Sequence, residues 1–175
     1  MSGRVDVIRE KLYRDEGGAV FAVLDGASVP GLLQKFADLQ PENACLYRGE
    51  LEPDMAEVAP YLVKLDRDGP FTDWVIDRGW GNHWGVFVES GVDLATLRRH
   101  FRGFLTVHDE SGKPLLFRYY DPRVLRTYLP SCDSEELKTI FGPLQSYMME
   151  DESASGLTRF MLKNGSLAKS VEQIA

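Results

Sequence analysis

The chain has 175 residues, of which 43% are hydrophobic and 27% charged, and its formal net charge is −7. This length and composition indicate a single globular domain that can bury a core without metal ions or disulfides. The acidic balance argues against nucleic-acid binding, which needs clustered Lys and Arg, and no apolar run approaches the roughly 20 residues that span a membrane.

Two further features of the whole chain favour the cytoplasm. The N-terminus has no basic stretch followed by an apolar stretch, so we expect no secretory signal. The two cysteines, Cys45 and Cys132, match neither a disulfide framework nor a zinc-binding pattern. We therefore expect a protein of the reducing cytoplasm.

The first part of the chain predicts a helix, a buried strand and a second helix. Residues 4–14 place their apolar side chains on one helical face. Residues 19–24 form a continuous apolar run, which is typical of a strand covered on both faces, as in a mainly parallel sheet. After a turn at Asp25 and Gly26, apolar residues repeat at helical spacing over residues 29–39.

The middle of the chain continues this alternation of strands and helices. Short strands are predicted at residues 44–47, 61–65 and 84–88. Helical segments are predicted between and after them, at about 54–59, 71–79 and 94–105. Such an alternation is typical of helices that pack on the faces of a sheet.

The last part of the chain predicts a hairpin, two helices and a pair of edge strands. Residues 105–108 and 115–120 fit an antiparallel hairpin, with 115–120 as a buried strand. The elements expected after it are helices at about 122–129 and 134–141, edge strands at 147–149 and 158–162, and a short helix or loose tail from residue 166.

The expected fold class is α/β, as a single domain on a mixed, mainly parallel sheet that is flanked by helices and has a late antiparallel hairpin. No internal repeat or low-complexity linker divides the chain. We assign residues 1–18 to an N-terminal helix and lead-in, residues 19–150 to the α/β domain, and residues 151–175 to a C-terminal edge strand and tail.

Candidate catalytic residues are few. His83 lies in a loop rich in Gly and Trp that enters a strand, and catalysis there would need a nucleophile, such as Cys45, and an acidic residue to orient the histidine. No nucleophile elbow, phosphate-binding loop or metal-binding histidine spacing occurs. We therefore expect no enzymatic activity, no metal and no cofactor, and a packing role for the tryptophans of this loop.

The junction between residues 118 and 123 concentrates charge where a strand gives way to a helix. Asp121 is placed to cap that helix. Arg118 needs a carboxylate partner if its strand is buried, because burying an unpaired charge is costly, and Asp121 is the carboxylate close to it in the sequence. Two interpretations remain open: an internal ion pair, or a partner-binding notch of Arg118, Asp121 and Arg123 bordered by Tyr119 and Tyr120, since Tyr and Arg are common interface anchors.

Five segments in order resemble a known family. They are VFAVLDGA at 20–27, CLYRG at 45–49, VAPYLV at 58–63, GNHWGVF at 81–87 and LFRYYDPRVL at 116–125. Their order and spacing resemble the adaptor, or effector-chaperone, domain of bacterial type VI secretion, the DUF4123 domain. The resemblance covers roughly residues 19–150.

The resemblance implies a non-catalytic protein of the bacterial cytoplasm. Such an adaptor would bind a cognate secreted effector and help to load it onto the VgrG spike protein, without contact with nucleic acid or membrane. The expected partner-binding residues are Arg118, Tyr119, Tyr120, Asp121, Arg123, Trp80, His83 and Trp84. The alternatives are an immunity protein that neutralises a toxin and a small hydrolase that uses His83.

Overall fold

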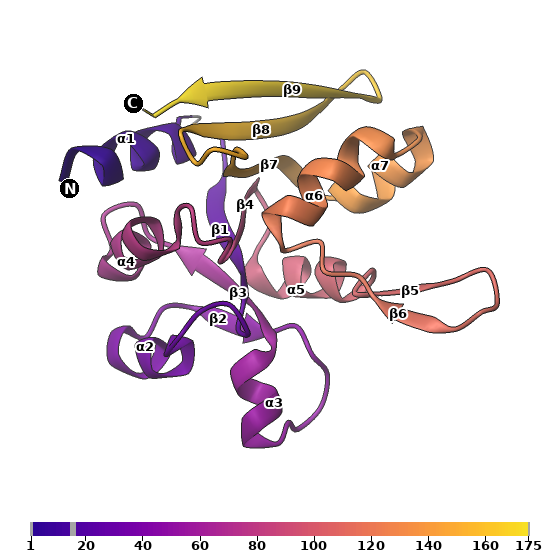
Figure 1. Cartoon of the computed structure of the whole chain (residues 1–175), viewed down its shortest axis with the longest axis horizontal. Coiled ribbons are helices and arrows are strands. Elements are labelled where there is room, and N and C mark those ends of the chain that lie inside the picture. Colours follow the sequence, from indigo (N-terminus) through magenta and orange to yellow (C-terminus); the bar gives the residue numbers. More distant parts are fainter. Residues whose placement is uncertain (1, 15–16, 175) are drawn as a thin grey trace.

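The computed structural model describes residues 2–14 and 17–174, and its centre is one large sheet (Figure 1). The strand order in the described residues is β2-β3-β1-β4-β7-β8-β9. These strands are β1 (Ala19–Asp25), β2 (Asn43–Cys45), β3 (Pro60–Leu65), β4 (Gly85–Ser90), β7 (Leu144–Glu150), β8 (Gly156–Lys163) and β9 (Ser166–Gln173). A separate two-stranded sheet contains β5 (Thr106–His108) and β6 (Pro114–Leu116).

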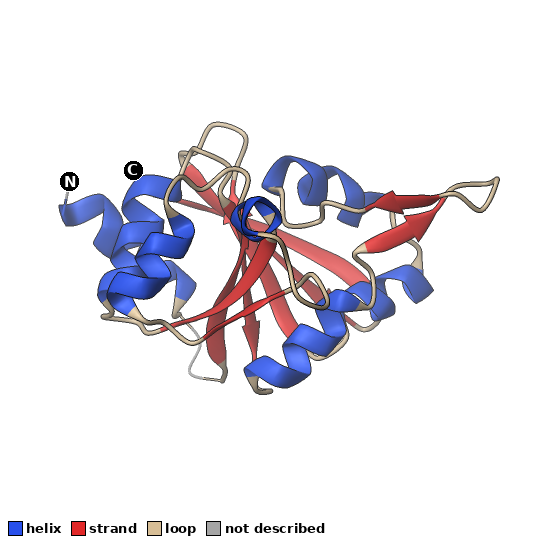
Figure 2. Ribbon diagram, turned by 90° about the horizontal axis from the view of Figure 1, so that it is seen from below, coloured by secondary structure: helices blue, strands red, loops and turns tan. Residues whose placement is uncertain are grey.

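Helices cover both faces of the large sheet (Figure 2). The helices are α1 (Ser2–Leu12), α2 (Leu32–Leu39), α3 (Pro53–Val58), α4 (Pro70–Gly79), α5 (Leu94–Arg102), α6 (Pro122–Tyr128) and α7 (Ser134–Phe141), and a short 3-10 helix, Leu129–Ser131, follows α6. This order of elements confirms the predicted alternation of strands and helices.

In the described part of the chain, no helix has the length and apolar content that a bilayer crossing requires.

The prediction of a mainly parallel sheet is wrong, because every pair of neighbouring strands among the described residues is antiparallel. The central strand β1 shows why: Ala22 lies opposite Val63 of β3 on one side and opposite Phe87 of β4 on the other, both in antiparallel register. The apolar run of β1 reports burial on two faces, and helices can supply that burial whichever way the neighbouring strands run.

The two faces of β1 belong to two separate cores. Ala22 and Leu24 pack in a cluster with residues of α1, α2 and α4. Phe21 and Val23 point the other way, into a cluster with residues of α5, α6 and α7. Because successive side chains of a strand point to opposite faces, a strand in this position needs an apolar residue at every place.

The C-terminus differs from the sequence prediction. Residues from 166 onward form the edge strand β9, which pairs antiparallel with β8, and not a short helix or loose tail. The two-residue turn before it contains Asn164 and Gly165, with φ of 52° and 79°. Asn-Gly favours the hairpin turn that needs positive φ at both central positions. The strands predicted at 147–149 and 158–162 exist, but they lie inside the sheet and not at its edge.

The hairpin of β5 and β6 is confirmed, but the buried strand predicted at 115–120 is wrong. The strand β6 ends at Leu116, a residue that is 51% exposed. The hairpin extends away from the rest of the molecule in both views (Figures 1 and 2). Two strands without a third cannot bury a face of their own, so Val107, Leu115 and Leu116 stay at the surface, whereas Tyr119 and Tyr120, beyond the end of β6, are buried.

A buried arginine ties the C-terminal strands to the rest of the fold. Arg159 of β8 is almost fully buried, and its guanidinium donates a hydrogen bond of 2.6 Å to the carbonyl of Lys11 at the end of α1. The same group lies 3.6 Å from Glu89 of β4 and 3.5 Å from Glu172 of β9. One cation therefore links α1 to three strands of the sheet.

Replacing this cation tests its role in stability. We expect Arg159→Ala to lower the free energy of unfolding by about 3–5 kcal/mol, because it removes the positive charge beside the buried carboxylate of Glu89. Urea unfolding followed by circular dichroism measures the change. Lys163→Ala, at the exposed end of the same strand, is the matched control and should change stability by less than about 0.5 kcal/mol. A similar small change for Arg159→Ala would contradict the interpretation.

Candidate functional site

The candidate site lies where two strands of the sheet end together. Because β1 and β7 both pair antiparallel with β4, they run in the same direction and finish at the same edge of the sheet. This edge is the one formed by the ends of strands, not by an outer strand. β1 ends in Asp25 and β7 ends in Glu150. Both acidic residues are buried, with exposed fractions of 2% and 4%, so each carboxylate needs hydrogen-bond donors or cations close by.

Asp25 holds the turn that follows β1 and also the junction at residue 118. Its carboxylate accepts hydrogen bonds from the amide of Ala27 at 3.0 Å and from the hydroxyl of Ser28 at 2.9 Å. The guanidinium of Arg118 forms an ion pair with the same carboxylate. The expected internal ion pair of Arg118 therefore exists, but its partner is Asp25 and not the neighbouring Asp121.

Asp121 caps α6, as predicted from the sequence. One carboxylate oxygen accepts a hydrogen bond of 2.9 Å from the amide of Arg123, and the guanidinium of Arg123 contacts both oxygens at 3.1 and 2.8 Å. Burial by itself raises the pKa of Asp121, but the bonds from Arg123 outweigh that effect, so the pKa lies below its ordinary value.

Glu150 organises the loop at residues 80–84. Its carboxylate accepts hydrogen bonds from the amides of Gly81, at 2.5 Å, and His83, at 3.2 Å. The imidazole Nδ1 of His83 lies 2.5 Å from the same group, close enough for an ion pair when the histidine is protonated, although the contact lacks hydrogen-bond geometry. The amides converge on one carboxylate because Gly81 and His83 both have positive φ, 88° and 57°.

The structure thus brings together the two regions that the sequence predicts as partner surfaces. The pKa of Arg123 is raised first by its hydrogen bond to Asp121, and also by the charges of Glu150 and Asp25. Arg123 therefore lies within electrostatic range of the carboxylates at the ends of both strands. The outer parts of the site are the side chains of Arg118 and Arg123, 46% and 57% exposed, and that of His83, which is partly exposed.

The four predicted aromatic residues of the site lie beneath this surface. Trp80, Trp84, Tyr119 and Tyr120 are all buried. The indole of Trp80 donates a hydrogen bond of 3.1 Å to the carbonyl of Ala154. The ring of Tyr119 packs edge-on against that of Tyr120, with centroids 5.5 Å apart. In this conformation their rings are enclosed, and the charged side chains form the exposed part of the site.

The geometry of His83 gives one part of a catalytic arrangement. Glu150 occupies the place of the acidic residue that orients a histidine base. Cys45, the nucleophile considered from the sequence, lies on the outer strand β2, with β3 and β1 between it and β4. In the described part of the chain, no group of three or more His, Cys, Asp or Glu residues could hold a metal ion.

Sequence reasoning misses two residues that organise the site, Asp25 and Glu150. Asp25 directly precedes a glycine, a pattern that is typical of an ordinary turn. Glu150 begins a run of three acidic residues, a pattern that is typical of a solvent-exposed segment. The need of Arg118 for a carboxylate is the available signal, and an Asp that directly follows a buried strand is a candidate for it. Glu150 offers no comparable signal, because its donors are backbone amides of a distant loop.

A comparison with protein families identifies the chain. The model of the family described as "Domain of unknown function (DUF4123)" matches residues 20–139, and the chain belongs to this family. The match includes Asp25, the loop at 80–84 and the junction at 118–123, and it ends before Glu150. No curated protein and no solved structure matches the chain.

The ion pair between Arg123 and Asp121 can be tested by titration. We expect Arg123→Ala to raise the pKa of Asp121, because burial continues to raise it while the guanidinium that lowers it is lost and only the backbone amide of residue 123 remains. A carboxyl group whose pKa is lower in the folded state than in the unfolded state stabilises the protein at pH values above the ordinary Asp pKa. This stabilisation is lost as the pH falls through the pKa of the folded state. The variant should therefore lose stability relative to wild type near neutral pH, with a smaller difference in acid. Carboxyl chemical shifts followed by NMR measure the pKa, with Arg78→Ala, on the exposed end of α4, as control.

Proposed function

We propose that this member of the DUF4123 family is a non-catalytic adaptor that binds a cognate type VI secretion effector and helps to load it onto the VgrG spike protein. The five segments whose order and spacing resemble the effector-adaptor domain all fall inside the family match at 20–139. The cytoplasm of the bacterium that makes the effector is the compartment that this role requires.

One observation carries the proposal. Three of the five resembling segments, at 20–27, 81–87 and 116–125, are far apart in the sequence but meet at one edge of the sheet. The amide of Asp25 donates a hydrogen bond of 2.8 Å to the carbonyl of Trp84, and Arg118 forms an ion pair with Asp25. Their exposed groups are cations that buried carboxylates hold in place from behind. A fixed guanidinium loses little freedom when it binds, and Arg is enriched among interface residues that carry binding energy.

The hairpin beside this edge adds an apolar surface. Val107 and Leu115 lie opposite each other across β5 and β6, and both are exposed, as is Leu116. Phe117 connects the hairpin to the body of the protein through an edge-on contact with Tyr128, with ring centroids 4.6 Å apart. Exposed apolar groups next to fixed cations fit a protein partner better than a small molecule.

An immunity protein that neutralises a toxin is the second candidate, and the acidic surface favours it when the toxin is basic. The chain carries a net charge of −7, and Glu50, Glu52, Asp54 and Glu57 are exposed along one short stretch. Co-expression separates the two roles. An immunity protein rescues cells from the active toxin, whereas an adaptor changes the solubility or secretion of the effector.

An affinity pull-down tests the proposal directly. Tagged wild-type protein, expressed in its own host under secretion-active conditions, should recover a large toxin-like protein, with or without a spike protein, by mass spectrometry. We expect Arg118→Ala combined with Arg123→Ala to reduce that recovery about tenfold or more, as for loss of interface anchors. Leu115→Ser combined with Leu116→Ser should also reduce recovery, and these exposed positions leave the core untouched.

The control for both variants is Arg78→Ala, an exposed arginine on α4. Circular dichroism establishes that each variant folds, which matters for Arg118→Ala because it leaves Asp25 without its cation. If both pairs of substitutions leave folding and effector recovery intact, the edge of the sheet is not the binding surface. A wild-type pull-down without an effector would count against the adaptor role itself.

A further inference from the structure

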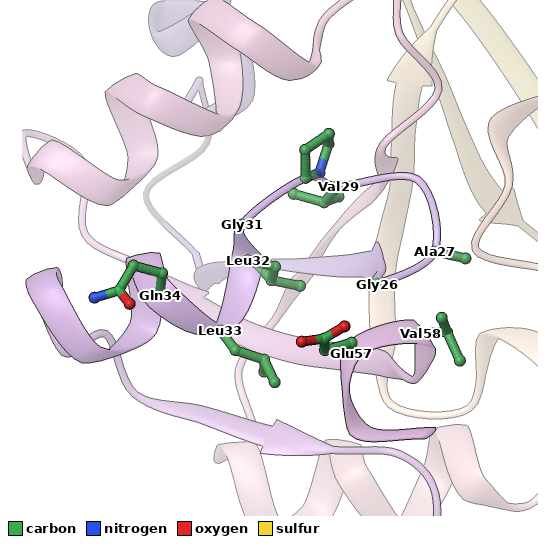
Figure 3. Close-up of a pocket in the computed structure, with 10 residues that line it drawn as sticks. Gly26, Ala27, Val29, Gly31, Leu32, Leu33, Gln34, Glu57 and Val58 are labelled. Carbon is green, nitrogen blue, oxygen red and sulfur yellow. The ribbon is translucent and has the colours of Figure 1, made fainter. Parts of the chain in front are cut away.

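A pocket lies on the other side of the turn that follows β1. Its walls are the segment from Gly26 to Gln34, which includes the start of α2, and the last turn of α3, and its volume is about 560 Å³. Figure 3 shows the side chain of Glu57 leaving α3 on the side that faces Leu32 and Leu33. The pocket is within the size range of sites that bind ligands or single side chains of a partner.

Backbone contacts hold the two walls of the pocket together. The amide of Gly26 donates a hydrogen bond of 3.0 Å to the carbonyl of Ala59, directly after α3. A side chain at position 26 would meet the carbonyl oxygens of Ala59 and Glu57 at 2.4 and 2.7 Å, so only glycine permits this approach. Gly31, with φ of 72°, then lets the chain turn into α2. The pocket is thus preformed.

The lining of the pocket has comparable polar and apolar surface and carries a single carboxylate. Leu33 and Val58 contribute accessible apolar side chains, whereas Val29 and Leu32 are buried members of the core. Glu57 contributes the only charged side chain among the lining residues. Glu57 lies in the last turn of α3, where the free carbonyl groups of a helix end favour a cation and disfavour an anion. A bound cation would therefore be stabilised beside Glu57.

Further apolar and acidic residues lie next to the pocket, on and before α3. Met55 and Val58 are neighbours on one face of α3, and both are more than 40% exposed. Between residues 49 and 63 the chain has four acidic residues, Glu50, Glu52, Asp54 and Glu57, and neither Lys nor Arg. In the described part of the chain, none of these four forms an ion pair. We call these four and the two apolar residues the α3 surface.

We propose that the pocket and the α3 surface bind a basic amphipathic segment of a partner protein, with its apolar side chains in the pocket and a Lys or Arg beside Glu57. Charge complementarity selects the basic residues of this occupant, because four acidic residues repel an acidic segment. The accessible side chains of Leu33, Met55 and Val58 select its apolar residues. The inference rests on the proposed adaptor role, in which the partner is the effector.

Binding of defined peptides tests the inference on the full chain without an identified effector. The probe is a short fluorescein-labelled peptide with Leu and Lys at amphipathic helical spacing, and the comparison peptide has Glu in place of every Lys. Fluorescence anisotropy measures both affinities at low and at moderate salt. We expect the Leu–Lys peptide to bind at least about tenfold more tightly than the Leu–Glu peptide, with the difference reduced by salt.

Two variants of pocket residues, each with a matched control, test whether the peptide binds at the pocket. Glu57→Gln should weaken binding of the Leu–Lys peptide about three- to fivefold, as for loss of an exposed ion pair, while Glu110→Gln, the same charge change in the hairpin loop, should leave it unchanged. Val58→Ser should weaken it at least threefold, by loss of apolar contact, and Val171→Ser, the same change at a similarly exposed position of β9, should not.

Two outcomes would overturn the inference. One is equal affinity for the two peptides, and the other is equal weakening by Glu57→Gln and Glu110→Gln, which would indicate attraction to the net charge alone. These readouts are independent of the pull-down. If the protein recovers no effector but binds the Leu–Lys peptide in a way that depends on Glu57, the proposed adaptor role is contradicted and the proposed specificity of the pocket is supported.

Discussion

The structure depends on hydrogen bonds and ion pairs to two buried carboxylates, Asp25 and Glu150. They end β1 and β7, the two strands that flank β4 and run in the same direction. A carboxylate that leaves water without donors destabilises the fold by several kcal/mol. The chain therefore brings distant segments to these two groups: Arg118 and the turn after β1 to Asp25, and the loop at 80–84 to Glu150. The same requirement that stabilises the edge of the sheet positions the exposed cations of the candidate site.

The two-sided burial of β1 explains why this edge is available. Because helices cover both faces of the central strand, the side chains near the middle of the sheet are enclosed. Contacts with a partner are then left to strand ends, connecting segments and projecting elements, which are the usual places for binding residues on a rigid scaffold. The hairpin of β5 and β6 is such an element.

A single turn separates two surfaces of opposite character. Asp25 binds Arg118 on one side, and the next residue, Gly26, binds the end of α3 on the other. The cations of the junction and the acidic α3 surface are consequently fixed relative to each other by the backbone of β1. A partner with a basic amphipathic segment and a separate acidic or carbonyl-rich region would match both surfaces at once, and such a pattern would set its orientation.

The sequence alone determined the features that depend on local pattern. The helical face of α1, the apolar run of β1, the cap at Asp121 and the hairpin before the junction all follow from spacing and residue type over a few positions. The resemblance of five short segments pointed to the family that the match over residues 20–139 shows. The Asn-Gly turn before β9 is a local signal as well, although the prediction of a tail overlooked it.

Only the tertiary structure decided strand direction, the partner of Arg118 and the depth of the aromatic residues. An apolar strand carries the same residues whether its neighbours run parallel or antiparallel, so β1 could not reveal the direction of β3 and β4. An arginine reveals that it needs a carboxylate but not which one, and Asp25 lies 93 residues away. Tyr and Trp serve cores and interfaces equally well, because each has an apolar ring and a polar group, and only packing placed them inside.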